Sequence, residues 1–330
     1  MDLTKEDELR TRTVLPGKLR RGFLIAAGIL WLGCRPVAAQ QIDYSKLQIK
    51  TTDLGNGVYL LGWQGGDSLV LVGDDGVVLV DTAVVQLVDK IKATIAHLST
   101  RPVRYVIITH AHADHFGGNE AMAKAGAVLV SQDNVRERMT KGQYIAAFKQ
   151  TIPPSVPAAI PTITYSSAMT IHADGETIEL IHTPRAHTDS DSLVYFRRAN
   201  VIHTSGTFGN DQTYTFFDLS SEGSLSGTIA AQERVLGLAN ERTRIIADEG
   251  EPSTKADLQA SHDALVVVRA RVQKLIDAGK SEEDVVAAKP LRDLEATWVH
   301  PGGFLTGEVF TRMAYESLKG IKPPKAPMGK

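Results

Sequence analysis

The stretch Thr109-His110-Ala111-His112-Ala113-Asp114-His115 follows directly after an apolar run at residues 103–108. An apolar run of this length is typical of a buried strand, so three imidazoles and a carboxylate are predicted to emerge together at its end. Buried polar side chains are costly unless a hydrogen-bond network or a metal ion satisfies them. Because imidazole and carboxylate groups are ligands of zinc, the stretch predicts a metal site at the end of a strand.

Regular patterns on both sides of this stretch predict an α/β protein. Short apolar runs between turn residues predict strands, and apolar residues at helical spacing predict helices. The first half shows strand patterns at 58–61, 68–72, 77–80 and 128–130, and helical patterns at 84–98 and near 119–124. The second half shows strand patterns at 178–181, 193–196, 201–202 and 244–247, and a helical pattern at 227–239. The two halves therefore share one plan, in which strands are followed by a helix and a further strand.

The C-terminal part is predicted to be helical. Residues 254–257 form a capping-box-like start, Gly279 can end the helix that follows, and a second helix is expected at 308–318. Four histidines stand alone in the sequence, and we interpret them as ordinary hydrogen-bonded residues: His97, His172, His262 and His300.

Composition excludes several classes of protein. The 330 residues are 43% hydrophobic and 22% charged, which is enough apolar material for a substantial core. A net charge of -2 without a long basic run argues against a nucleic-acid partner and leaves a small-molecule substrate as the expected one. The single Cys34 excludes a disulfide framework and a thiolate-rich zinc site. The oligomeric state cannot be predicted from these features.

The first 39 residues have the pattern of an export signal. A polar segment that ends in Arg20-Arg21 precedes an apolar block at residues 22–33 and the small residues Val37-Ala38-Ala39. The paired arginines favour a bacterial twin-arginine signal over an ordinary secretory one. We therefore expect a periplasmic or secreted protein that begins at Gln40 and has no stable membrane insertion. An uncleaved anchor and a lipoprotein modified at Cys34 are weaker alternatives.

The quoted stretch also resembles a family signature. The spacing His110-x-His112-x-Asp114-His115 is similar to that of the metallo-β-lactamase superfamily, and the strand 77–80 followed by Asp81 and the turn 117–119 resemble its surroundings. The segment 182–192 resembles the one that supplies a further histidine, here His187. The resemblance implies an αββα sandwich over residues 40–255, with residues 256–330 as a helical extension packed on the same domain.

The same resemblance implies where metal ions bind. Its first site corresponds to His110, His112 and His187, and its second site to Asp114 and His115 together with a distant histidine and a bridging aspartate. The last two are replaced here by Glu249 and Gly206. Two arrangements therefore remain open: one zinc ion on the three histidines, which we favour, or a second zinc ion that also uses Asp114, His115 and Glu249.

A zinc-dependent hydrolase is the predicted function. A zinc-bound hydroxide would attack the carbonyl of a β-lactam, a lactone or another ester-like or amide-like bond. Asp114 is expected to orient the water or receive its proton, and His115 to move protons or bind the developing oxyanion. Asp81 is expected to hold a ligand histidine in orientation. The alternatives are a non-catalytic metal-binding or accessory protein with a degenerate site, and a dinuclear enzyme that uses Glu249.

Some neighbouring residues are candidates for supporting roles. His203, Ser205 and Asp248 lie near the two altered positions in the sequence and are expected to assist the centre. The Pro-rich segment 151–161 and the segment 210–220 are candidates for the walls of a substrate cleft.

Overall fold

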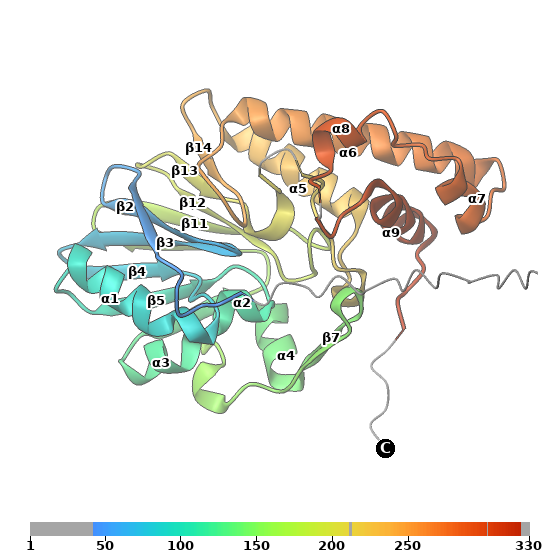
Figure 1. The fold of residues 1–330 in the computed structure, drawn as a ribbon. Helices are drawn as coiled ribbons and strands as arrows, with labels where there is room; N and C mark the ends of the chain where they lie inside the picture. The colour runs from blue at the N-terminus through green and yellow to red at the C-terminus, as the bar shows by residue number, and fades with distance from the viewer. Residues whose placement is uncertain (1–41, 211–212, 302, 325–330) are drawn as a thin grey trace, which may run out of the picture. The chain divides into compact units, whose positions relative to one another are not determined.

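The computed structural model describes residues 42–210, 213–301 and 303–324 (Figure 1). Every helix and strand named below belongs to one compact unit, Asp43–Lys330. The predicted export signal at residues 1–39 lies outside the described residues. Within the described part of the chain, no helix is long and apolar enough to cross a membrane.

The first sheet of the described chain has seven strands in the order β1-β2-β3-β4-β5-β6-β9. The first four strands pair antiparallel with their neighbours, and β4, β5, β6 and β9 pair in parallel. Parallel strands end at the same edge of a sheet, so the residues that follow β4 and β5 lie close together. The strand bounds are β1 Lys50–Asp53, β2 Val58–Trp63, β3 Gly66–Gly73, β4 Gly76–Val80, β5 Val103–Ile108, β6 Val128–Gln132 and β9 Ile163–Tyr165.

The second sheet has the order β10-β11-β12-β13-β14. Its strands pair antiparallel except for β13 and β14, which are parallel. A separate hairpin is formed by β7 Gln143–Ile145 and β8 Gln150–Ile152. The bounds in the second sheet are β10 Ala168–Ala173, β11 Glu176–His182, β12 Ser192–Phe196, β13 Val201–His203 and β14 Arg244–Ile246.

Side-chain alternation along the strands builds three apolar layers. In β3, Leu69 and Leu71 pack in a cluster with Leu180 and Val194 of the second sheet, whereas Val70 belongs to the cluster on the opposite face. Successive side chains of a strand point to opposite faces, so strands that are apolar throughout feed both layers. The two sheets therefore face each other across a shared core, and each has a second apolar face that helices cover.

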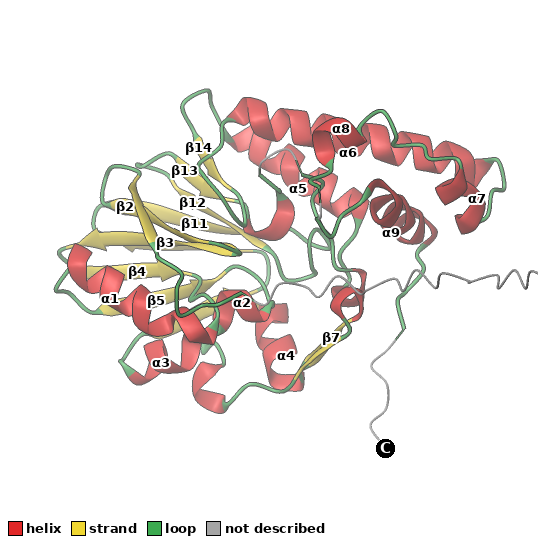
Figure 2. Ribbon diagram, in the orientation of Figure 1, coloured by secondary structure: helices red, strands yellow, loops and turns green. Residues whose placement is uncertain are grey.

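Helices cover both outer faces (Figures 1 and 2). Apolar side chains of α1 Val88–Leu98, α3 Asn119–Lys124 and α4 Asp133–Lys141 lie in the outer cluster of the first sheet. Side chains of α5 Leu225–Leu238 and α6 Lys255–Asp277 pack on the second sheet. The layer order is helix, sheet, sheet, helix, which confirms the predicted αββα sandwich.

The chain ends in additional helices, as predicted. The bounds are α7 Glu282–Ala287, α8 Glu295–Trp298 and α9 Gly307–Lys319, and they share one apolar cluster with α5 and α6. Thr254 and Asp257 form the capping box that begins α6. The sequence patterns missed several elements, among them α4 and β10. Only Val135 and Met139 are buried in the otherwise polar α4, so it has no apolar stripe. β10 is an edge strand whose alternating Met169 and Ile171 are only partly buried.

Candidate metal centre

Three histidines from two loops meet at one end of the sandwich. His110 and His112 follow β5 of the first sheet, and His187 lies in the loop between β11 and β12 of the second sheet. One ligand atom from each lies within 4.8 Å of the other two, and all three residues are buried. The structure therefore brings together the three residues that the sequence assigned to the first metal site.

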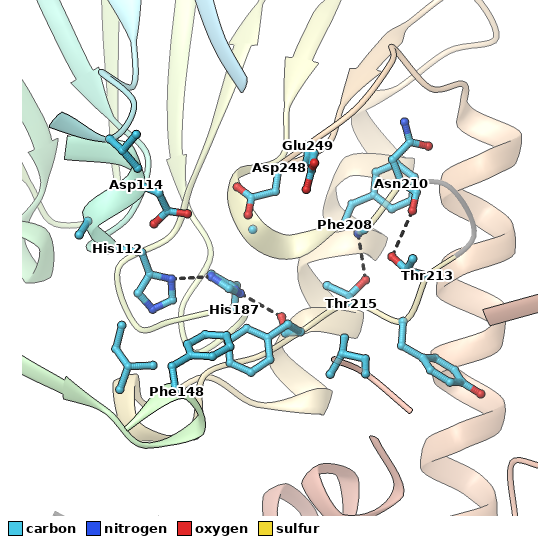
Figure 3. Close-up of a pocket in the computed structure, with 18 of the residues that line it drawn as sticks. His112, Asp114, Phe148, His187, Phe208, Asn210, Thr213, Thr215, Asp248 and Glu249 are labelled. Atoms are coloured by element: carbon cyan, nitrogen blue, oxygen red, sulfur yellow. Dashed lines mark hydrogen bonds between the residues drawn. The ribbon is translucent and has the colours of Figure 1, made fainter. Parts of the chain in front are cut away.

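Hydrogen bonds on the far side of two of these rings determine which nitrogen faces the centre. His187 Nδ1 lies 2.9 Å from the carbonyl oxygen of Phe216, and His112 Nε2 lies 3.2 Å from Asp218 Oδ2. Burial opposes ionisation of Asp218, but its hydrogen bond to His112 holds its pKa well below the usual range. Both oxygens therefore accept hydrogen bonds, and the rings donate outward. This leaves His187 Nε2 and His112 Nδ1 facing each other at 3.0 Å (Figure 3).

The ring of His110 is held from behind by two hydroxyl groups. Its Nδ1 lies 3.1 Å from Thr109 Oγ1 and 3.1 Å from Ser205 Oγ. These hydroxyls donate to carboxylates, Thr109 to Asp81 at 2.7 Å and Ser205 to Asp191 at 3.2 Å. Their oxygens are therefore acceptors for the Nδ1–H of His110. The other nitrogen, His110 Nε2, is buried and has no hydrogen-bond partner.

A metal ion fits this donor set. Two imidazole lone pairs at 3.0 Å repel each other unless a proton or a cation lies between them, and the lone pair of His110 Nε2 is also unsatisfied. One metal ion would satisfy all three nitrogens at once. Burial lowers the pKa of His110 well below its usual value, and burial together with His112 lowers that of His187 to about 4. These two rings are therefore neutral near pH 7, the form that binds metal.

His115 lies beside this centre in an acidic environment. Its Nδ1 is 2.8 Å from Asp81, and its Nε2 is 3.3 Å from Asp248 and 3.6 Å from Asp114. Burial lowers the pKa of His115, but the charges of Asp248, Asp114 and Asp81 outweigh it and raise the pKa to about 10. Asp114 remains half-exposed at the pocket, and although burial opposes it, His115 and His112 lower the pKa of this carboxyl group.

A second group of ligand atoms includes Asp248 and not Glu249. Atoms of His110, His115 and Asp248 lie within 4.8 Å of one another. Glu249 is exposed, and its Oε1 accepts a hydrogen bond of 2.8 Å from the backbone amide of Gly65. Gly206, at the position of the expected bridging aspartate, lies against the ring of His187.

A pocket of about 690 Å³ opens beside the histidines. Three carboxylates line it, from Asp114, Asp248 and Glu249, and the ring of Phe148 lies on its other side (Figure 3). Phe216, which also lines the pocket, packs against Phe148. None of the lining residues that the structure describes is a lysine or an arginine. The surface of the pocket is thus apolar on one side and acidic on the other.

The structure corrects one predicted wall of this pocket. Residues 210 and 213–216 line it, as expected for the segment 210–220, but the segment 151–161 does not. Phe148 and Gln150 of the preceding hairpin take that place. His300, interpreted from the sequence as an ordinary structural residue, also lines the pocket.

Two supporting carboxylates were not predicted. Asp218 holds His112, and Asp191 accepts from Ser205 behind His110. Burial raises the pKa of Asp191 to about 7, although the backbone amide of Thr188 opposes this. Both aspartates are fully buried, but burial of a single aspartate leaves no periodic signal in a sequence.

The fold and the histidine cluster define an α/β protein with a metal-binding centre at one end of two facing sheets. The family model of the metallo-beta-lactamase superfamily matches residues 61–302, and the chain belongs to that superfamily. Members of this superfamily are metal-dependent hydrolases.

Solved structures are similar in fold. A stereoselective inverting sec-alkylsulfatase, Pisa1 from Pseudomonas sp., superposes with a TM-score of 0.62 at 18% identity, covering 81% of this chain and 50% of that one. The chain thus spans about half the length of that enzyme. A metallo-beta-lactamase from Pontibacter korlensis gives 0.56 at 18% identity, covering 66% of this chain and 99% of that one. The metallo-beta-lactamase DIM-1 gives 0.54 at 13% identity, covering 67% and 99%.

Proposed function

We propose that this protein is a zinc-dependent hydrolase that holds one zinc ion with His110, His112 and His187 and cleaves an ester-like or amide-like carbonyl bond. The observation that carries the proposal is the convergence of three imidazole nitrogens: His110 Nε2, His112 Nδ1 and His187 Nε2. Each presents a lone pair to the centre, and no N–H or O–H group of the described residues donates a hydrogen bond to it. Zinc held by three histidines acts as a Lewis acid and lowers the pKa of water towards ~7, which supplies a nucleophile at neutral pH.

We infer a single metal ion from the position of His110. It belongs to both groups of ligand atoms, and its Nδ1 is engaged by Thr109 and Ser205. Only Nε2 remains for a metal, and one lone pair serves one ion. Occupation of the three-histidine site leaves His115, Asp248 and the nearby Asp114 for a second ion. The charges around His115 raise its pKa to about 10, so its imidazole would have to lose a proton before it could bind that ion. A dinuclear centre is the second candidate, since Asp248 stands next to His115.

Asp114 is the residue that we assign to proton transfer. Its carboxylate lines the pocket, and the neighbouring histidines keep it ionised by lowering its pKa. An ionised carboxylate at this place can accept a proton from the attacking water and later return it to the leaving group. His115 lies 3.6 Å from it and can stabilise that charge.

The pocket favours uncharged substrates among the candidates. Its aromatic side suits an alkyl or aryl group, and its carboxylates repel an anion. Lactones and simple esters fit this surface better than β-lactams that carry a carboxylate, or than sulfate esters such as those cleaved by an alkylsulfatase.

The experiment is metal analysis combined with a hydrolysis screen. The purified protein is dialysed against metal-free buffer, zinc per chain is measured, and lactones, esters and β-lactams are assayed for the wild type and for Asp114→Asn. We expect one zinc per chain and turnover that a chelator abolishes and that Asp114→Asn lowers by about 10²-fold or more. Zinc binding without turnover of any of these classes would favour a non-catalytic accessory protein, and two zinc ions per chain would favour the dinuclear centre.

We also propose that the chain is exported with removal of residues 1–39, on the basis of the paired arginines and the small residues before Gln40. Cell fractionation and the intact mass of the recovered protein test this. A full-length chain found in the cytoplasm would contradict it.

A further inference from the structure

Ser205 has a backbone conformation that a serine rarely adopts. It follows β13 and has a φ of 56°, in the left-handed region. Glycine enters this region freely, whereas a residue with a Cβ atom is strained there. The strain persists only where surrounding contacts compensate for it, and such residues often lie at functional sites.

The contacts that compensate for the strain at Ser205 include one to the proposed metal ligand His110. The residue is fully buried, and its Oγ lies 3.1 Å from His110 Nδ1 and 3.2 Å from Asp191 Oδ1. Its backbone amide donates to His203 Nδ1 at 3.0 Å, which holds the turn in place. Because the hydroxyl proton goes to Asp191, the oxygen accepts from His110 Nδ1–H. The lone pair of His110 is thereby placed on Nε2, the nitrogen available to a metal.

The next residue acts on a second ligand. A Cβ atom at Gly206 would lie 2.4 Å from His187 Cδ2, 2.5 Å from Cγ and 2.7 Å from Nε2. Real Cβ atoms do not approach other atoms so closely, so the ring of His187 occupies the space that a side chain at residue 206 would need. His187 keeps its position only because this residue is a glycine.

We propose that Ser205 and Gly206 together position the metal ligands of a one-metal centre. Ser205, together with Thr109, sets the tautomer and orientation of His110, and Gly206 leaves room for the ring of His187. Both are positioning residues, since neither touches the metal or the substrate. This inference rests on the proposed zinc centre. It implies that an aspartate restored at residue 206 would displace His187 instead of completing a second site.

The test compares Ser205→Gly with Ser205→Ala. Zinc affinity is measured by competition with a chromophoric chelator, the geometry by the absorption spectrum of the cobalt-substituted protein, and the stability of the metal-free protein by urea unfolding. Both variants lack the hydroxyl, so we expect each to bind zinc about 10- to 100-fold more weakly and to change the cobalt spectrum. Only Ser205→Gly relieves the backbone strain. The metal-free Ser205→Gly protein should therefore unfold at a higher urea concentration than the metal-free Ser205→Ala protein.

A matched control separates strain from metal positioning. Lys289 has a φ of 48° and is exposed between α7 and α8, away from the centre. Lys289→Gly should raise the urea midpoint and leave both the zinc affinity and the cobalt spectrum unchanged. Unchanged zinc affinity in Ser205→Gly and Ser205→Ala would overturn the role of Ser205.

Gly206→Asp tests the second half of the proposal. We expect it to lower zinc affinity at least 10-fold and to bind no more zinc per chain than the wild type. Binding of two zinc ions by Gly206→Asp would overturn the proposal. If the wild type itself binds no zinc, the proposed function fails. If the wild type binds zinc and the Ser205 variants bind it equally well, only the positioning inference fails.

Discussion

Asp67 in β3 is a buried acid that should make the free energy of unfolding depend on pH. It is 1% exposed, and neither carboxylate oxygen has a hydrogen-bond partner of good geometry. Burial raises its pKa from 3.8 to about 8, and the negative charges of Asp248, Glu249 and Glu251 add to the shift. Between these two pH values the folded protein holds a proton on Asp67 that the unfolded chain has released.

The consequence for stability has a definite sign. Because the folded state binds one proton more, the free energy of unfolding falls as the pH rises, by about 1.4 kcal/mol per pH unit between roughly pH 4 and pH 8. At pH 7 the accumulated cost is about 4 kcal/mol relative to strongly acidic solution. Asp67→Asn removes this titration, and its buried amide donors cost ~2 kcal/mol at every pH. The variant should therefore match the wild type near pH 5 and be more stable by about 2 kcal/mol at pH 7.

The assay is urea unfolding of the metal-free protein at pH 5, 6 and 7. The decisive quantity is the stability difference between Asp67→Asn and the wild type, which should grow by about 2.7 kcal/mol from pH 5 to pH 7 whatever the amide costs. Asp74→Asn, in the exposed turn after β3, controls for the change of net charge. A difference for Asp67→Asn that does not change with pH would refute the reasoning.

Three further predictions concern the metal centre and its pocket. Asp218→Ala leaves His112 Nε2–H without its acceptor and should weaken zinc binding by about 10- to 100-fold, measured by chelator competition, and an unchanged affinity would show that Asp218 does not orient this ring. Zinc at ~1,000 times its Kd should stabilise the wild type by about 4 kcal/mol, seen as a higher melting temperature in calorimetry, and identical melting curves with and without zinc would contradict the centre. An uncharged lactone or ester should be hydrolysed with a kcat/KM at least about 10-fold higher than an analogue that carries a carboxylate. Glu249→Gln should reduce this ratio of the two kcat/KM values, because it removes one negative charge and keeps an oxygen that accepts from the amide of Gly65. A wild-type kcat/KM that is higher for the anionic analogue than for the uncharged substrate would refute the charge argument.

Local sequence was sufficient to predict strands and helices with a regular apolar pattern, and metal ligands that lie close together in the chain. The strand at 103–108 was predicted with the bounds of β5, and its position directly before His110 and His112 was enough to expect both at a strand end. The helix at 119–124 agrees with α3. These features depend on residues within one strand or one helical turn, so backbone periodicity determines them.

The sequence could not show which of two neighbouring carboxylates lies at the metal centre. After β14 the chain presents Asp248 and Glu249 in succession, and the sequence favoured Glu249 as the metal ligand. In the structure Asp248 lies 3.3 Å from His115, whereas Glu249 accepts from the amide of Gly65. Both residues lie in the bend that follows β14 and both line the pocket, so the path of this short loop decides which carboxylate reaches His115.

In this protein, local spacing and alternation along strands predict an α/β chain and the cluster of possible zinc ligands at residues 110–115. The two facing sheets and the ligand His187 were implied by the family resemblance. Only the tertiary structure decides how the ligands are held. Asp218 holds His112 across 106 residues of sequence, and Ser205 holds His110 across 95. Asp191 acts on His110 through Ser205, which lies 14 residues further along the chain. Such contacts exist only after the two sheets have packed, since a side chain that holds a buried imidazole is selected by its place in space and leaves no period in the chain.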